Sequence, residues 1–120
     1  MTAPTTMTSN FKDELCAEFT GRVDALSLHL TDPGTDGSND SPTAHAALTW
    51  TTPIDGVSYA VATFTELSGD FTHVGLWGQT DTTFRMGIPC PINFSTAADV
   101  AVMVVHEVNN GAFVAAVAPA

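Results

Sequence analysis

From Val23 onward the residues alternate with a period of two, and this alternation constrains the fold more than any other feature of the chain. Leu26, Leu28 and Leu30 alternate with smaller or more polar residues, as expected of a half-buried β-strand. Further strands are predicted at short intervals, over residues 44–51, 57–65, 72–77, 84–88, 99–108 and 112–117. About seven short strands favour a mainly β fold, an antiparallel sandwich or a barrel-like arrangement, over any α/β layout.

Turn-forming residues separate these strands, with breaks predicted over residues 53–56, 67–70, 78–82, 89–91 and 109–111. The last of them, Asn109-Asn110-Gly111, is the clearest hairpin turn, because Asn and Gly adopt the positive φ angles of tight turns. A longer loop over residues 31–42 is dense in Asp, Pro, Gly, Ser and Asn. The strands between the breaks carry few charges, and the edges of such strands readily pair with other strands, as an assembly subunit requires.

One short amphipathic helix is predicted ahead of the strands, over residues 10–20. Asn10 is its expected N-cap and Gly21 its expected stop. Phe11, Leu15 and Phe19 are spaced four residues apart and form one apolar stripe. A helix of about three turns is unstable alone in water. We therefore expect the stripe to dock on the sheet or on a neighbouring molecule.

The 120 residues suffice for one domain, which we expect to consist of an extended arm (1–9), a β domain (10–118) and a tail (119–120). Thirteen acidic against three basic side chains give a formal charge of −10. Nucleic acids and anionic membranes are therefore not expected partners. The longest apolar stretch, residues 100–105, is too short to span a bilayer. The N-terminal residues have neither the basic nor the apolar region of a secretory signal.

The two cysteines, Cys16 and Cys90, are far apart in the sequence and form no Cys-x-x-Cys pair. We expect two small hydrophobic side chains in or near the core. A disulfide between them is the alternative that the sequence leaves open.

The acidic loop is the one segment whose residue types suit a metal ion. Its spacing does not match the EF-hand loop and lacks the closing glutamate, so turn formation accounts for these residues. A weak calcium site is the alternative, and no cofactor is predicted. The possible oxygen ligands are Asp32, Asp36, Asn39 and Asp40.

No catalytic constellation is recognisable, and the chain is predicted not to be an enzyme. Its sequence contains no nucleophile elbow and no glycine-rich phosphate loop. The aromatic residues are spread about one per strand, which favours core positions. A sugar-binding face that includes Trp50 and Trp77 is the alternative. The histidines lie far apart in the sequence: His29, His45, His73 and His106.

Two segments resemble a family of small β-rich virion proteins of tailed bacteriophages, especially those of actinobacteria. Residues 26–38 read LSLHLTDPGTDGS, similar to the family's LSLHTADPGxxGxx, and residues 71–77 read FTHVGLW, similar to TVTHVGLWDA. The resemblance covers about residues 10–88, and the helix that opens with Asn10-Phe11 also fits it. It implies structural roles and no catalytic residues. Asp32, Pro33 and Gly34 would shape the loop, and His73, Gly75 and Trp77 would lie on a central strand.

The chain departs from the family pattern at two places. The family carries a Ser-Tyr-Ala-Arg-like stretch after its glycine-rich loop, where residues 41–46 here read SPTAHA. Gly78 follows Trp77, where the family has Asp-Ala. No contact made by the family's arginine can therefore be transferred to this chain.

The resemblance and the low charge together favour a capsid decoration protein, expected as a homotrimer on the outer surface of a phage head. It would be made in the host cytoplasm and bind the major capsid protein, and its negative charge would keep it away from packaged DNA. A minor tail or tail-fibre component that takes part in host attachment is the alternative, and a stand-alone carbohydrate-binding module is a third. The predicted assembly contacts are Thr5, Thr6, Met7, Phe11, Leu15 and Phe19.

Overall fold

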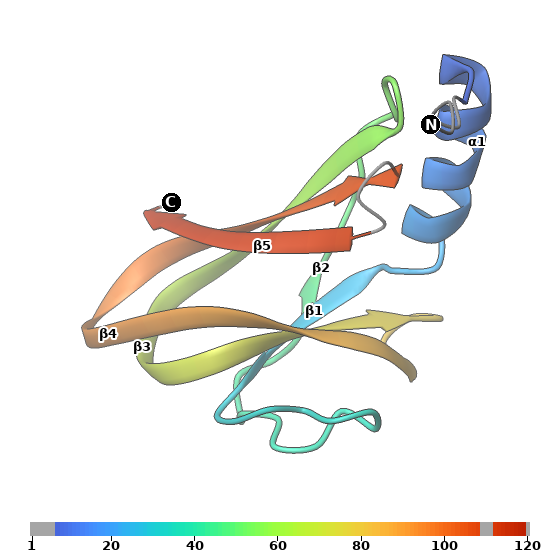
Figure 1. Ribbon diagram of the computed structural model, residues 1–120. Helices are drawn as coiled ribbons and strands as arrows, with labels where there is room; N and C mark the ends of the chain where they lie inside the picture. The colour runs from blue at the N-terminus through green and yellow to red at the C-terminus, as the bar shows by residue number, and fades with distance from the viewer. Residues whose placement is uncertain (1–6, 109–111, 120) are drawn as a thin grey trace, which may run out of the picture.

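In the part of the chain that the structure describes, the fold is one antiparallel sheet of five strands with a single helix at its end (Figure 1). The computed structural model describes residues 7–108 and 112–119. Across the sheet the strands follow the order β2-β1-β3-β4-β5. The elements are α1 (Ser9–Thr20), β1 (Ala25–His29), β2 (Ala46–Ala47), β3 (Val57–Gly78), β4 (Thr83–Glu107) and β5 (Ala112–Pro119).

The long hairpin of β3 and β4 dominates the sheet. Its ladder runs from the pair Val57 and Glu107 at one end to the pair Gly78 and Thr83 at the turn. The register shifts in the middle, between Phe64 and Gly69, and there the hairpin bends so that its two halves lie one above the other (Figure 1). Register shifts of this kind bend a strand and increase its twist. The bend lets both halves of one hairpin bury side chains in one common core, which contains Leu26, Leu28, Ala62, Val74, Leu76, Ile92, Val102 and Val104.

The structure confirms a mainly β, antiparallel fold with one short helix, but the strand count of about seven is wrong. The predicted strands 57–65 and 72–77 are one strand, β3, and the predicted strands 84–88 and 99–108 are one strand, β4. All five strands belong to a single sheet, so a sandwich or barrel is not confirmed. The predicted break at 89–91 is absent because β5 pairs only with residues 100–107 of β4. In the described part of the chain, the first half of β4 is thus an edge, where a proline disturbs no second ladder.

Strand β1 is buried along its whole length, although the sequence predicts a half-buried strand. Leu26 and Leu28 point into the core, while Ser27 and His29 are also fully buried. Ser27 and His29 lie beneath the loop 31–42, because His29 bonds to the Ser38 carbonyl and Ser27 bonds to His29. The predicted turn at 109–111 lies outside the described residues, and β4 and β5 pair in antiparallel fashion on either side of it.

Helix α1 begins earlier than predicted and buries a different face. Thr8, not Asn10, is the N-cap, and its hydroxyl accepts a hydrogen bond from the Phe11 amide at 3.2 Å. Phe11 and Phe19 are 49% and 51% exposed, so the stripe is not buried on the sheet, and its docking on a neighbouring molecule stays a prediction. The buried positions are Cys16 and Thr20, which share the other side of the helix. Gly21 ends the helix as predicted, with φ −64° rather than a left-handed angle.

Candidate functional site

The two segments that carry the family resemblance are neighbours in the sheet. β1 pairs with the second half of β3, so that Ala25 faces Trp77, Ser27 faces Gly75 and His29 faces His73. At Gly75 an added Cβ would come within 2.5 Å of both the Ser27 hydroxyl and the His29 ring. The glycine is therefore required by the close approach of two polar side chains on the neighbouring strand. Sequence reasoning placed these residues on strands and did not foresee their contact.

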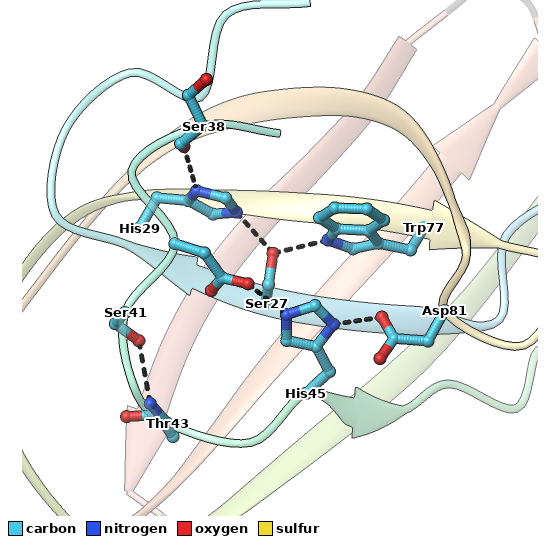
Figure 2. Close-up of polar contacts among 9 residues, drawn as sticks. Ser27, His29, Ser38, Ser41, Thr43, His45, Trp77 and Asp81 are labelled. Atoms are coloured by element: carbon cyan, nitrogen blue, oxygen red, sulfur yellow. Dashed lines mark hydrogen bonds and ion pairs between the residues drawn. The ribbon is translucent and has the colours of Figure 1, made fainter. Parts of the chain in front are cut away.

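A chain of hydrogen bonds runs through these residues (Figure 2). The Trp77 indole donates to the Ser27 hydroxyl at 2.8 Å, and that hydroxyl lies 2.5 Å from His29 Nε2. His29 Nδ1 lies 2.8 Å from the Ser38 carbonyl oxygen, which can only accept. Nδ1 therefore donates to this carbonyl, and in the neutral ring Nε2 accepts from the Ser27 hydroxyl. The Trp77 indole, the Ser27 hydroxyl and both nitrogens of His29 thus each have a partner, as buried polar groups require.

The proximity of Ser27 and His29 resembles the nucleophile and base of a hydrolase, but the geometry does not serve that chemistry. Both side chains are 0% exposed, so no substrate reaches the hydroxyl. In a catalytic triad the second nitrogen of the histidine bonds to a carboxylate, whereas His29 Nδ1 bonds to the Ser38 carbonyl. The pair is a structural link between β1 and the loop.

His45 lies beside this chain and joins two acidic residues that are distant in sequence. Its Nε2 donates to Asp40 at 2.5 Å, and its Nδ1 donates to Asp81, which lies in the turn between β3 and β4 (Figure 2). Its ring also packs against Trp77, with 5.2 Å between ring centroids. Burial alone would lower the pKa of His45. Its hydrogen bonds to Asp81 and Asp40 and the charges of both carboxylates outweigh burial, so the pKa is raised above its ordinary value. His45 thus ties the loop to the β3–β4 turn, and the two carboxylates favour its protonated form.

A shallow hollow of about 390 Å³ opens next to His45. Its walls include Ala46 and Ala47 of the edge strand β2, together with Asp24 and Thr80. Asp24 Oδ2 accepts from the Thr80 amide at 2.9 Å, while Asp24 Oδ1 is the one buried side-chain oxygen or nitrogen of the described residues without a partner. The other acid and the base that line this hollow, Asp81 and His45, bond to each other.

The loop residues expected to shape the turn bond to their own backbone. Asp32 accepts from the Gly34 amide at 2.8 Å, and Gly34 has a φ of +64°. Pro33 is buried, and its carbonyl accepts from the amides of Gly37 and Ser38. At Gly37 an added Cβ would come within 2.7 Å of the Trp77 ring, so the loop lies directly over the indole.

The oxygens considered for calcium are used in the same local way. Asp36 accepts from both the hydroxyl and the amide of Ser38, and these bonds lower its pKa. The Asn39 side chain donates to the Asp32 carbonyl at 3.0 Å, and Asp40 bonds to His45. Over residues 7–108 and 112–119, no cluster of three or more His, Cys, Asp or Glu side chains could hold a metal ion.

Cys16 and His106 form a second buried polar pair, which joins α1 to β4. The thiol sulfur lies 3.2 Å from His106 Nδ1, and the His106 ring packs between Phe19 and Phe113. Burial, and then the charge of Asp13, raises the pKa of Cys16, and burial lowers the pKa of His106. Both groups are therefore neutral, whereas a catalytic cysteine is an ion pair with its histidine. Both cysteines are free, Cys90 included, so they do not form the disulfide considered above.

The two tryptophans of the sugar-binding alternative belong to separate clusters. Trp77 packs against His45 and Phe84, and Trp50 packs against Phe113. The Trp50 indole donates to the Val23 carbonyl at 2.7 Å, so both indole N–H groups are engaged inside the protein.

Among the predicted assembly contacts, Phe11 and Phe19 are exposed, and Met7 and Leu15 are half-buried. Thr5 and Thr6 lie outside the described residues. Sequence reasoning missed a larger apolar surface on β3, β4 and β5, where Tyr59, Val61, Met103 and Val114 are 41–61% exposed. The signal was present, because both sets of alternating positions in these strands are apolar.

No family model, curated protein or solved structure matches this chain. Its one helix within the described ranges, α1, is too short and too polar to cross a membrane.

Proposed function

We propose that this chain is a structural protein of a tailed-bacteriophage virion, and that it binds the outer surface of the capsid as a homotrimer and stabilises the shell. The observation that carries the proposal is the edge strand β5. It ends the sheet order, contains no charged residue, and has no strand beyond it among the described residues. Such an edge readily accepts a strand of a neighbouring protein.

The virion setting comes from the family resemblance, and two further observations support a structural role. The residues of the resembling segments bond to one another: Trp77 to Ser27, Ser27 to His29, and His29 to the loop. The formal charge of −10 suits an exposed position on a particle whose interior holds DNA.

The test measures binding of the purified protein to phage heads that lack it. Deletion of residues 1–6 keeps the N-cap Thr8 and should leave the β domain folded by circular dichroism, but it should reduce binding if the arm clasps the shell. Ala118→Lys, on exposed β5, should also reduce binding, because a charged edge pairs poorly with a strand. Ser95→Lys, at an exposed position of β4 away from β5, is the matched control.

Copy number in purified virions separates the proposal from its alternative. On the order of hundreds of copies per particle indicates the shell, and a handful indicates a tail or tail-fibre component. Absence from virions, or wild-type protein that does not bind heads, would contradict the capsid role.

A further inference from the structure

Helix α1 contacts the sheet through one side and lies outside its main core. The hydrophobic core cluster of the described residues begins after the helix, at Val23. On α1 itself Cys16 and Thr20 are buried, whereas the side chains of Phe11 and Phe19 are half exposed. Elements with few buried apolar contacts open more readily than the core does. The helix can therefore leave the sheet while the sheet stays folded.

Three polar contacts join the first half of α1 to the turn that precedes β3. The Asp13 carboxylate accepts a hydrogen bond from the Gly56 amide at 2.8 Å. The Ser9 hydroxyl donates to Asp55 at 3.0 Å, and Lys12 Nζ lies 3.7 Å from the same carboxylate. The Asp55 side chain is 63% exposed, and solvent screens exposed ion pairs. The two contacts of Asp55 therefore position the helix more than they stabilise it.

The second half of α1 docks through the pair of Cys16 and His106. Both side chains are buried, and the Cys16 sulfur lies 3.2 Å from His106 Nδ1. The His106 ring lies between Phe19 of the helix and Phe113 of β5. Ser58 of β3 is the ladder partner of His106. Residues from α1 and from three strands thus enclose the imidazole and keep water away from it.

The charged and titratable groups near this pair come from the helix, the turn before β3 and β4. Asp13 is close enough for its charge to raise the pKa of Cys16, although burial is the larger cause. Burial lowers the pKa of His106. Its neighbours on β3 and β5, Ser58 and Phe113, carry no charge. The other charged residues at the contact are Lys12, Asp55 and Glu107, which follows His106 in β4.

We infer that α1 is an acid-sensitive clasp, which leaves the sheet when His106 takes up a proton. A charged imidazole is unfavourable in a buried site, whereas water solvates it once the helix has left. Since burial lowers the pKa of His106 in the docked protein, docking is complete above the ordinary value of 6.5 and weakens as the pH falls below it. The raised pKa of Cys16 keeps its thiol neutral over the same range. The inference goes beyond the capsid role and does not depend on it.

The two cysteines of the full chain provide the test, because they report on different parts of the fold. Cys16 is 0% exposed beneath the helix, and Cys90 is 3% exposed within the core cluster. The protein is treated between about pH 7.5 and about pH 5, on both sides of the ordinary histidine pKa, with dithiodipyridine, which modifies thiols in acid. Mass spectrometry of peptides assigns the label to each cysteine. Each rate is divided by the rate of the same cysteine in the urea-unfolded chain at the same pH.

We expect the relative rate of Cys16 to rise by up to about tenfold per pH unit below about pH 6.5, because release takes up one proton. Cys90 should stay protected, because the core remains closed. The inference is overturned if Cys16 is as protected at the lowest pH as at the highest. It is also overturned if Cys16 and Cys90 become reactive together, since the whole domain would then open.

Two histidine variants assign the effect to one residue. His106→Gln is neutral at every pH and should abolish the rise in the Cys16 rate. His73→Gln changes a half-buried position of β3 that pairs with β1, and it should keep the rise. A rise of wild-type size in His106→Gln would contradict the clasp. Binding to phage heads is measured separately, so either proposal can fail while the other stands.

Discussion

Replacement of His45 should change how the stability of the protein depends on pH. The pKa of His45 is raised in the folded protein above its ordinary value of 6.5, because the two carboxylates outweigh burial. A group with a raised folded pKa stabilises the protein fully below its unfolded pKa. The contribution of His45 should therefore be complete below about pH 6 and should disappear as the pH rises through its folded pKa.

The magnitude follows from the exposure of the three side chains. Hydrogen bonds to charged groups contribute about 1.5–3 kcal/mol each when they are buried. Here the His45 side chain is 16% exposed, but Asp40 and Asp81 are 32% and 43% exposed, and solvent screens them. Exposed ion pairs contribute up to about 1 kcal/mol each, so the two bonds together should stabilise the protein by about 1–2 kcal/mol.

The assay is urea denaturation of wild type and His45→Gln at about pH 5.5, below the pKa of histidine, and at about pH 9, above it. The difference in unfolding free energy between the two proteins should be about 1–2 kcal/mol at the lower pH and should shrink at the higher pH. His106 acts in the opposite direction, because its pKa is lowered and its protonation favours the unfolded chain. It is present in both proteins, so its effect cancels. An equal difference at both pH values would refute the ion pairs of His45 with Asp40 and Asp81.

Three further substitutions test the packing. Gly75→Ala should destabilise the protein by about 3 kcal/mol in urea, because its Cβ would lie 2.5 Å from His29 and Ser27; a loss below about 1 kcal/mol would contradict this. Trp77→Ala should reduce the unfolding free energy by about 3–5 kcal/mol. Trp77→Phe, which keeps a ring, should lower it by less, and a small loss for the alanine variant would revive the sugar-binding alternative. Phe19→Ser should destabilise the protein much less than Trp77→Ala, because the ring is 51% exposed and packs only against His106 among the aromatic rings of the described residues.

The sequence predicted where β-structure occurs but not where strands begin and end: residues 44–51 were expected to form one strand, and β2 is only Ala46–Ala47. The alternation from Val23 onward, around Leu26 and Leu28, predicted a strand where β1 (Ala25–His29) lies, because a period of two is a local property. The proline-rich segment at 89–91 was read as a break, although β4 continues through it. Whether a proline ends a strand depends on the partners of that strand, which local sequence does not contain.

The contacts of the candidate site could be predicted from the sequence even less than the strand ends. His45 and Asp81 are 36 residues apart, and Cys16 and His106 are 90 apart. Neither spacing matches a known motif, so only the folded chain brings the partners together. The exposed face of α1 was misjudged for a related reason. The helix docks through the small residue Cys16 and through Asp13, whose carboxylate accepts from the Gly56 amide at 2.8 Å.

The long hairpin also has a consequence for how the chain folds. Residues at its turn are close in sequence, whereas Val57 and Glu107 are 50 positions apart (107 − 57) and yet pair. If the ladder forms from the turn outward, each new pair closes only a short additional loop, and the entropy lost at each step is small. The turn around Asp81 would then nucleate the domain, and β5 would join it last. Destabilising substitutions near that turn should slow refolding, whereas destabilising substitutions in β5 should mainly accelerate unfolding.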